Sequence, residues 1–191
     1  MKSQGFFIAL FCLTIFSACS SKKVLIMSNG KVTVNENTIT LQQGGTHTET
    51  SVVPDGDSLI VVSPSGTSGY AVKENGLYIL NLKKDTLVGS YQRTGTDNSQ
   101  QVISQENLVV RIDSLQQLMV GKNATEASRN YTIFPLSVAR ITTNVDAQVV
   151  GPFLKMPGSF DASREHEVYK FYTNKEMAEI VDKLKKMVSD R

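Results

Sequence analysis

Short runs of alternating apolar and polar residues dominate residues 24–92, and turn-forming residues separate them. Alternation with a period of two is typical of β-strands that bury one face. So many short strands favour an antiparallel sandwich or a curled sheet. The predicted strands are Val24–Ser28, Lys31–Val34, Thr38–Leu41, Thr48–Val53, Ser58–Ser63, Tyr70–Lys73, Leu77–Leu82 and Thr86–Gln92.

Turn signals predict how these strands connect. Asn29-Gly30 and Asn75-Gly76 are residue pairs that favour type I′ turns, so each predicts a tight hairpin between its flanking strands. The segment 35–37 predicts a further turn. The pair Gly44-Gly45 interrupts the alternation, so we expect separate strands on its two sides.

Two predicted strands are apolar enough to be central in a sheet. The run Leu59–Val62 is apolar throughout, which is typical of a buried strand. In Leu77–Leu82 both faces are largely apolar, because Leu77 and Ile79 share one face while Tyr78, Leu80 and Leu82 share the other. We therefore expect neighbours on both sides of each of these strands.

A middle helix is predicted from Ser104 to Val120, with Gly121 ending it. An apolar stripe at helical spacing supports it, formed by Leu108, Ile112, Leu115 and Met119. The alternative is a strand at Leu108–Ile112 followed by a short helix capped by Asp113, because β-branched residues cluster there.

The C-terminal segment, about residues 174–189, is a strongly amphipathic predicted helix. Thr173 and Glu176 have the spacing of a capping box. Its apolar face is expected to cover a sheet, and the alternative is a docking helix for a partner. That face is formed by Met177, Ile180, Val181, Leu184 and Met187 or Val188.

The remaining elements complete an α+β fold that is mainly antiparallel β. Residues 93–101 contain no apolar side chain, so a loop or a sub-boundary is expected near 93–103. Otherwise residues 24–191 are expected to form one domain. The later predicted strands are Tyr131–Phe134, Val138–Thr143, Ala147–Val150 and Val168–Tyr172.

The N-terminus has the pattern of an export signal. Lys2 precedes an apolar run, Phe6–Phe16, which is too short for a membrane-spanning helix of about 20 residues. Residues 1–18 are therefore predicted to be a signal peptide. Residues 19–23 would then be a lipidated cysteine and a short linker before the domain.

The tetrapeptide Phe16-Ser17-Ala18-Cys19 resembles the lipobox of bacterial lipoproteins. The resemblance covers only this segment and implies cleavage before Cys19, acylation of that cysteine and a membrane partner through the lipid anchor. It implies a location in the bacterial cell envelope, at the outer membrane facing the periplasm or the cell surface. The alternative is an ordinary signal peptide cleaved after Ser20.

Charge and cysteine content narrow the function classes. The formal net charge is +2, and loss of Lys2 with the signal peptide lowers it further, which argues against a nucleic-acid partner. The two cysteines are Cys12 and Cys19, so the acylated chain would have no thiol for a disulfide or a catalytic cysteine. No cofactor is expected.

Two histidines are candidates for a metal site. Alternation would place His47 and Glu49 on one strand face, and His166 lies between Glu165 and Glu167. Nothing in the spacing brings these clusters together, so no metal or catalytic residue is assigned. Three Asp-Ser/Thr-Leu tripeptides resemble a bacterial O-glycosylation sequon, which marks Ser58, Thr86 and Ser114 as candidate glycosylation sites.

No catalytic motif is present in the sequence, so we expect a non-enzymatic binding or scaffolding module held on a membrane, with an envelope protein or a glycan as partner. An envelope hydrolase, with or without a metal, is the first alternative. A module for a small ligand or glycan is the second, and it would need an apolar pocket with convergent polar groups.

Overall fold

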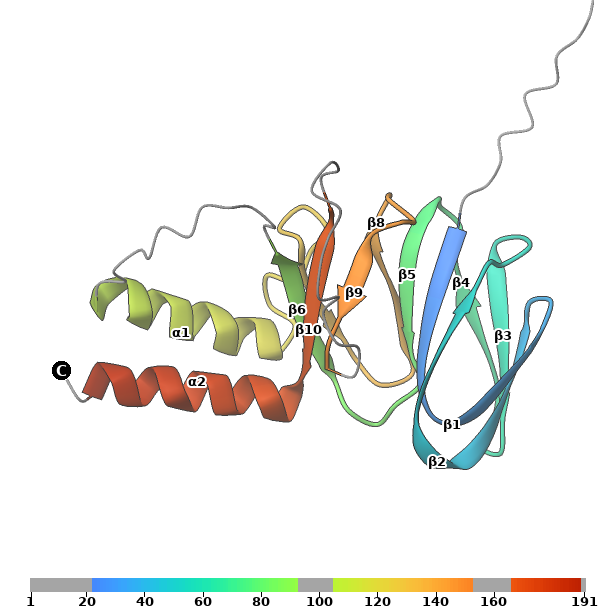
Figure 1. Cartoon of the computed structure of the whole chain (residues 1–191), viewed down its shortest axis with the longest axis horizontal. Helices are drawn as coiled ribbons and strands as arrows, with labels where there is room; N and C mark the ends of the chain where they lie inside the picture. The colour runs from blue at the N-terminus through green and yellow to red at the C-terminus, as the bar shows by residue number, and fades with distance from the viewer. Residues whose placement is uncertain (1–21, 93–104, 153–165, 190–191) are drawn as a thin grey trace, which may run out of the picture.

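A computed structural model describes residues 22–92, 105–152 and 166–189, and it confirms the α+β class (Figure 1). The predicted signal peptide, Cys19 and the polar loop at 93–103 lie outside the described residues, as does the segment 153–165.

The strands are β1 Lys22–Asn35, β2 Thr38–Val52, β3 Ser58–Ser63, β4 Gly66–Ala71, β5 Gly76–Asn81, β6 Leu87–Gln92, β7 Asn130–Ile133, β8 Ser137–Thr142, β9 Gln148–Val150 and β10 Val168–Thr173. The helices are α1 Gln105–Met119 and α2 Asn174–Ser189.

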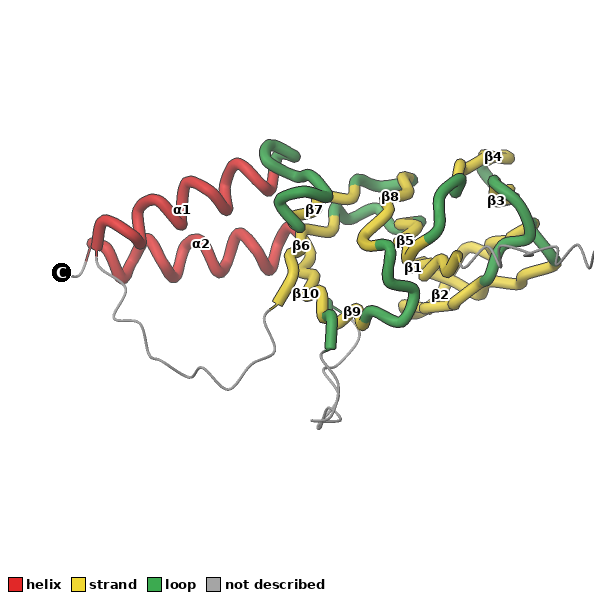
Figure 2. The backbone as a smooth tube through the Cα atoms, turned by 90° about the horizontal axis from the view of Figure 1, so that it is seen from above, coloured by secondary structure: helices red, strands yellow, loops and turns green. Residues whose placement is uncertain are grey.

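The strands form two sheets. A six-stranded sheet has the order β4-β3-β2-β1-β5-β8, and a four-stranded sheet has the order β7-β6-β10-β9. Most pairs are antiparallel, but β1–β5, β2–β3 and β9–β10 are parallel, so both sheets are mixed. The larger sheet curls until its edge strands β4 and β8 come into contact (Figure 2). We call it the curled sheet.

The curl depends on a corner at which β1 and β2 bend together (Figure 1). The β1–β2 register shifts between Asn29 and Gly30, opposite Gly44 and Gly45. Gly44 and Gly45 have φ of 94° and 150°, values that side-chain-bearing residues rarely adopt. The hairpin predicted at Asn29-Gly30 is therefore wrong, as is the break predicted at Gly44-Gly45. Each belongs to one long strand, and the glycines let these strands turn a corner.

The second predicted hairpin, at Asn75-Gly76, is also wrong. The flanking strands do not pair, because β4 pairs with β3 while β5 lies between β1 and β8. Gly76 has φ of 141°, and a Cβ there would collide with the Thr142 carbonyl on β8. The glycine thus serves close strand packing. The turn predicted at 35–37 is confirmed, with Glu36 at φ of 53°.

Two apolar cores follow from this arrangement. The first lies inside the curled sheet and includes Val24, Ile26, Ile39, Leu41, Leu59, Val61, Tyr70, Leu80 and Leu82. The second lies between the curled sheet and the four-stranded sheet and includes Leu25, Met27, Leu77, Ile79, Tyr131, Ile141, Tyr169 and Phe171. The central position of β5 is confirmed, since all its residues are buried.

The predicted central position of β3 is confirmed, since it lies between β2 and β4, but only one of its faces is buried. Leu59 and Val61 point into the first core, but Ile60 and Val62 on the other face are 42% and 38% exposed. The four-stranded sheet covers the outer face of β1, β5 and β8, and its apolar contacts do not extend to β3. An apolar run alone cannot distinguish these two situations.

The long middle helix is confirmed rather than the strand alternative. α1 spans the β-branched cluster without a break, and Gly121 follows it with φ of 78°. The capping box of α2 is also confirmed. The Glu176 carboxylate accepts from the Thr173 backbone N–H at 2.8 Å, and the Glu176 N–H donates to Oγ1 of Thr173 at 3.2 Å.

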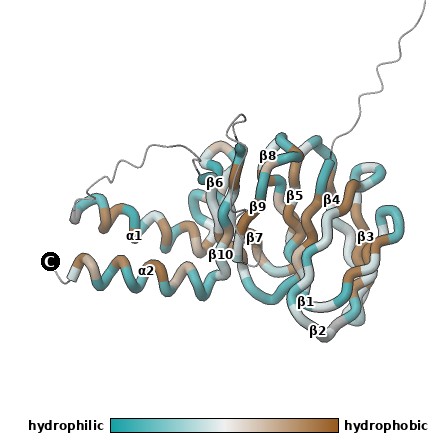
Figure 3. The backbone as a smooth tube through the Cα atoms, viewed as in Figure 1, coloured by the Kyte–Doolittle hydropathy of each residue, from teal (hydrophilic) through white to brown (hydrophobic). Residues whose placement is uncertain are grey.

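The expectation that α2 covers a sheet is wrong for most of its length. α1 and α2 pack side by side and project away from the four-stranded sheet (Figure 1). Only their sheet-proximal ends join a third core, with Val88, Leu118 and Met177. Figure 3 shows polar and apolar positions alternating along both helices, while apolar positions concentrate in the strands. The apolar stripe of α2 therefore pairs with a helix, and Met187 remains half exposed.

Candidate functional site

His47 and Glu49 do share one face of β2, as the alternation predicts, and they meet a lysine from a distant segment. The Nε2 atom of His47 lies 2.7 Å from Oε1 of Glu49, and Lys83 Nζ lies 3.1 Å from Nδ1 of His47. When Lys83 donates to Nδ1, the imidazole proton lies on Nε2 and is donated to Glu49. The histidine then links the Lys83 ammonium group to the Glu49 carboxylate.

This cluster is largely withdrawn from solvent. Lys83 is 4% exposed, and burial lowers its pKa below the ordinary lysine value, although the charges of Asp85 and Glu49 oppose the shift. The second oxygen of Glu49, Oε2, is buried without a hydrogen-bond partner among the described residues. Because these groups are tied to one another, the cluster holds the segment after β5 against β2.

His166 lies in a different place, a polar cleft of about 240 Å³ lined by Tyr91, Arg129, Asn144, His166 and Glu167. The Arg129 guanidinium stacks on the Tyr91 ring at 4.5 Å from its centroid. The Glu167 carboxylate accepts from Tyr169 at 2.6 Å and from Thr142 at 3.0 Å. One oxygen of Glu167, the carboxylate that lines this cleft among the described residues, is thus bound to the fold rather than left for a ligand.

The two histidines are at opposite ends of the curled sheet. His47 lies opposite Asn29, beside the corner, whereas the Thr142 that binds Glu167 lies opposite Leu77 at the start of β5. Sequence reasoning left open whether the clusters meet, and the structure does not bring them together. Among the described residues, no group of three His, Cys, Asp or Glu side chains could hold a metal ion.

The three glycosylation candidates lie in unrelated settings. Ser58 is exposed at the start of β3, and the preceding residue Asp57 pairs with Lys22 at 2.6 Å. Thr86 is half-buried, and its carbonyl accepts from the Asn174 N–H at 3.0 Å. Ser114 is exposed in the middle of α1. Two of the three serine or threonine side chains are therefore accessible.

Sequence reasoning missed an apolar cavity, which lies at one end of the curled sheet. Its volume is about 320 Å³. Five strands or their ends contribute to it, which makes it the mouth of the curled sheet. Its lining comprises Leu41, Val61, Ser63, Ser65, Ser68, Tyr70, Leu82, Lys83, Lys84, Pro135 and Leu136.

A second cleft of about 310 Å³ continues the mouth toward the glycine corner. It shares Leu41 and residues 82–84 with the first cleft and adds Asn29, Gly44 and Gly45. The local signals for this site were weak. Residues 63–66 resemble an ordinary serine- and glycine-containing turn, and Pro135 resembles an edge marker. Only the curl brings them together.

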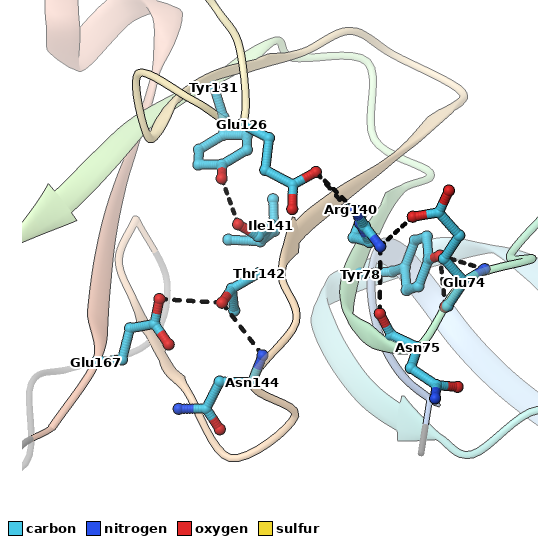
Figure 4. Close-up of polar contacts among 10 residues, drawn as sticks. All are labelled: Glu74, Asn75, Tyr78, Glu126, Tyr131, Arg140, Ile141, Thr142, Asn144 and Glu167. Atoms are coloured by element: carbon cyan, nitrogen blue, oxygen red, sulfur yellow. Dashed lines mark hydrogen bonds and ion pairs between the residues drawn. The ribbon is translucent and has the colours of Figure 1, made fainter. Parts of the chain in front are cut away.

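Ion pairs connect neighbouring segments at the opposite end of the curled sheet. Figure 4 shows Arg140 on β8 between the carboxylates of Glu74 and Glu126. Arg140 pairs with Glu74 from the β4–β5 connection, and its Nη2 lies 3.0 Å from Oε2 of Glu126. Hydrogen bonding to Glu126 raises the pKa of Arg140 above its ordinary value. This network bridges the seam between β4 and β8, so the two ends of the curled sheet differ in chemistry.

A short chain of polar contacts continues along β8 in Figure 4, from Tyr131 to the Ile141 carbonyl and from Thr142 to Glu167 and Asn144. Burial raises the pKa of Tyr131 to about 12 and that of Tyr169 further. Both phenols therefore stay neutral at physiological pH and donate hydrogen bonds, Tyr131 to the Ile141 carbonyl of the other sheet and Tyr169 to the Glu167 carboxylate of its own segment.

Comparisons with known proteins give no relative. No family model, no curated protein and no solved structure matches this chain. Within the described ranges, no helix has the length and apolar character needed to cross a membrane.

Proposed function

We propose that this protein is a bacterial cell-envelope lipoprotein that is held on a membrane through acylated Cys19 and acts by binding rather than by catalysis. The observation that carries the proposal is the start of the domain. Lys22 already lies in β1, is 5% exposed and pairs with Asp57 at 2.6 Å. Three residues span at most about 10 Å, so the curled sheet would lie against the bilayer.

The direction of β1 then sets the orientation of the domain. Lys22 lies opposite Gly76 and Met27 lies opposite Asn81, so β1 runs from the anchored end toward the mouth. At about 3.3 Å per residue this stretch covers roughly 17 Å. The mouth would therefore open away from the anchoring membrane, where a ligand or an envelope partner can reach it.

The described polar clusters support binding over catalysis. His47 is engaged on both ring nitrogens, and Glu167 accepts two hydrogen bonds from its own fold. The hydrolase alternative used His47 and His166 together, and these residues lie at opposite ends of the curled sheet.

Metabolic labelling with radioactive palmitate tests the anchor. We expect label in the wild-type protein, none in Cys19→Ala, and recovery of the wild-type protein with membranes after a high-salt wash. Cys12→Ala is the matched control and should label like the wild type, because Cys12 lies inside the predicted signal peptide. A wild-type protein that carries no label would refute the anchor.

A further inference from the structure

The mouth of the curled sheet has the composition of a ligand site. Leu41, Val61 and Leu82 form an apolar interior surface, and the cavity volume of about 320 Å³ lies at the lower end of the range for ligand pockets, roughly 300–1,000 Å³. Small molecules commonly bind in the mouths of β-barrels. A neighbouring cleft of about 310 Å³ extends the same surface.

The rim of the mouth carries an exposed apolar side chain at a strained position. Leu136 is 64% exposed and has φ of 54°, in the left-handed region that a bulky residue rarely occupies. Asn81 fixes this turn, because its buried amide donates to the carbonyls of Ile133 and Phe134 at 3.1 and 3.3 Å. The fold therefore maintains Leu136 over the cavity at a conformational cost.

Polar groups gather on the other side of the same cavity. Ser63, Ser65 and Ser68 line this side, and their hydroxyls are already hydrogen-bonded within the fold. Oγ of Ser63 lies 2.8 Å from Oγ of Ser65 and donates to the Gly66 carbonyl at 3.0 Å, and Ser68 bonds to the phenol of Tyr70. Lys84 is exposed, and no described carboxylate forms an ion pair with it. Lys83 also lines the cavity, but its ammonium group is directed to His47. One cationic group and several hydroxyls thus face an apolar interior.

We propose that the mouth binds a single-chain amphiphile with an anionic head, of the fatty-acid type. The acyl tail lies against Leu41, Val61 and Leu82 under Leu136, and the carboxylate pairs with Lys84. A compact apolar cavity suits a tail better than a sugar ring, and Lys84 favours a negative head over a neutral one. This inference deepens the proposed binding function and does not depend on the anchor.

Equilibrium dialysis with radiolabelled octanoate tests the proposal. The mature protein is held in phosphatidylcholine nanodiscs. Protein-free nanodiscs measure how much octanoate partitions into the lipid, and this amount is subtracted. We expect one saturable site for octanoate and about tenfold weaker binding of octanol, which has the same tail and no charge. Absence of saturable octanoate binding would overturn the proposal, while palmitate labelling would still decide the anchor separately.

Two substitutions test whether octanoate binds in the mouth. Lys84→Gln should remove most of the preference for octanoate over octanol, and Leu136→Gly should weaken both ligands by about tenfold. Leu136→Gly also relieves the left-handed strain, so its melting temperature should equal or exceed that of the wild type. A purely structural role for Leu136 would change the melting temperature without changing either affinity.

Matched controls lie at the far end of the curled sheet. Lys73→Gln removes an exposed lysine beside Glu74, and Glu36→Gly relieves the same kind of strain, at φ of 53°, in the β1–β2 turn. Both should bind octanoate like the wild type. If neither Lys84→Gln nor Leu136→Gly changes the affinity for octanoate, the ligand binds elsewhere on the protein. If octanol binds more tightly than octanoate, the proposal that the ligand has an anionic head is wrong.

Discussion

The curled sheet and the helix pair bury their apolar residues in different ways. Inside the curled sheet, strands face one another across a closed core, and Ile26, Leu59 and Leu80 are fully buried. The helix pair contacts the sheet only at its proximal end, and Val109 and Val110 of α1 are more than half exposed. Other helix residues, such as Leu108 and Val181, are buried, but a smaller share of the apolar side chains is removed from water than in the curled sheet. The helix pair should therefore contribute less to stability, because stabilisation follows the area removed from water.

The largest effect should come from the interior of the curled sheet. Leu80→Ala should lower the free energy of unfolding by about 3 kcal/mol, since a fully buried leucine in a closed core leaves a cavity. Urea unfolding of the purified protein measures this loss. Val109→Ala is the matched control on the helix pair and should change stability by less than about 0.5 kcal/mol. If Leu80→Ala and Val109→Ala lower the free energy of unfolding equally, the stated difference between the curled sheet and the helix pair is wrong.

A smaller effect is expected at the junction between the two regions. Met177 is 4% exposed and lies with Val88 and Leu118, so Met177→Ala should cost about 2 kcal/mol. We expect amide exchange to rise in α1 and α2 while amides of the curled sheet keep their protection. Uniform loss of protection would instead show that both regions unfold as one unit.

High pH should weaken the contact between the two sheets. The pKa of Tyr131 is about 12 in the folded protein and about 10 in an unfolded chain, so the folded state holds the proton more tightly. Stability is therefore fully present below pH 10 and falls as pH rises toward 12. Thermal melts across this range should show a shallower fall for Tyr131→Phe. If the melting temperature falls equally steeply with pH in the wild type and in Tyr131→Phe, the loss of stability comes from other ionisable groups.

The smallest effect is expected at the distal end of the helix pair. Leu184 lies in the apolar stripe of α2 but is only half-buried, so Leu184→Asp should cost less than about 1 kcal/mol and fray the last turns. Thermal melts and helical circular dichroism measure both effects. A global loss comparable with Leu80→Ala would mean that the distal helices are covered by a surface beyond the described residues.

The local elements could be predicted because their causes are local. The Thr173–Glu176 capping box and the stripe of α1 depend on residues three or four positions apart, and both predictions are confirmed. The central place of β5 could also be predicted, since burial of both faces requires apolar residues on both. Composition and periodicity are enough for such features.

The candidate site could be predicted only in part. Alternation predicted that His47 and Glu49 share a face, but it gave no sign of Lys83, which lies 36 positions away in the chain. The lining of the mouth comes from several strands that meet only after the sheet curls. Each of its segments, including the turn at 63–66, resembles an ordinary surface turn when read alone.

The sequence by itself determined where most strands lie, both helices and the cap of α2, because these follow from side-chain periodicity and capping within a few residues. Tertiary structure decided which strands pair, and so decided that Asn29-Gly30 is a corner and Gly76 a close contact rather than two hairpins. It also decided that α2 packs on α1 instead of a sheet. The physical reason is that pairing and curvature minimise exposed apolar area over the whole chain, a quantity that no short segment contains.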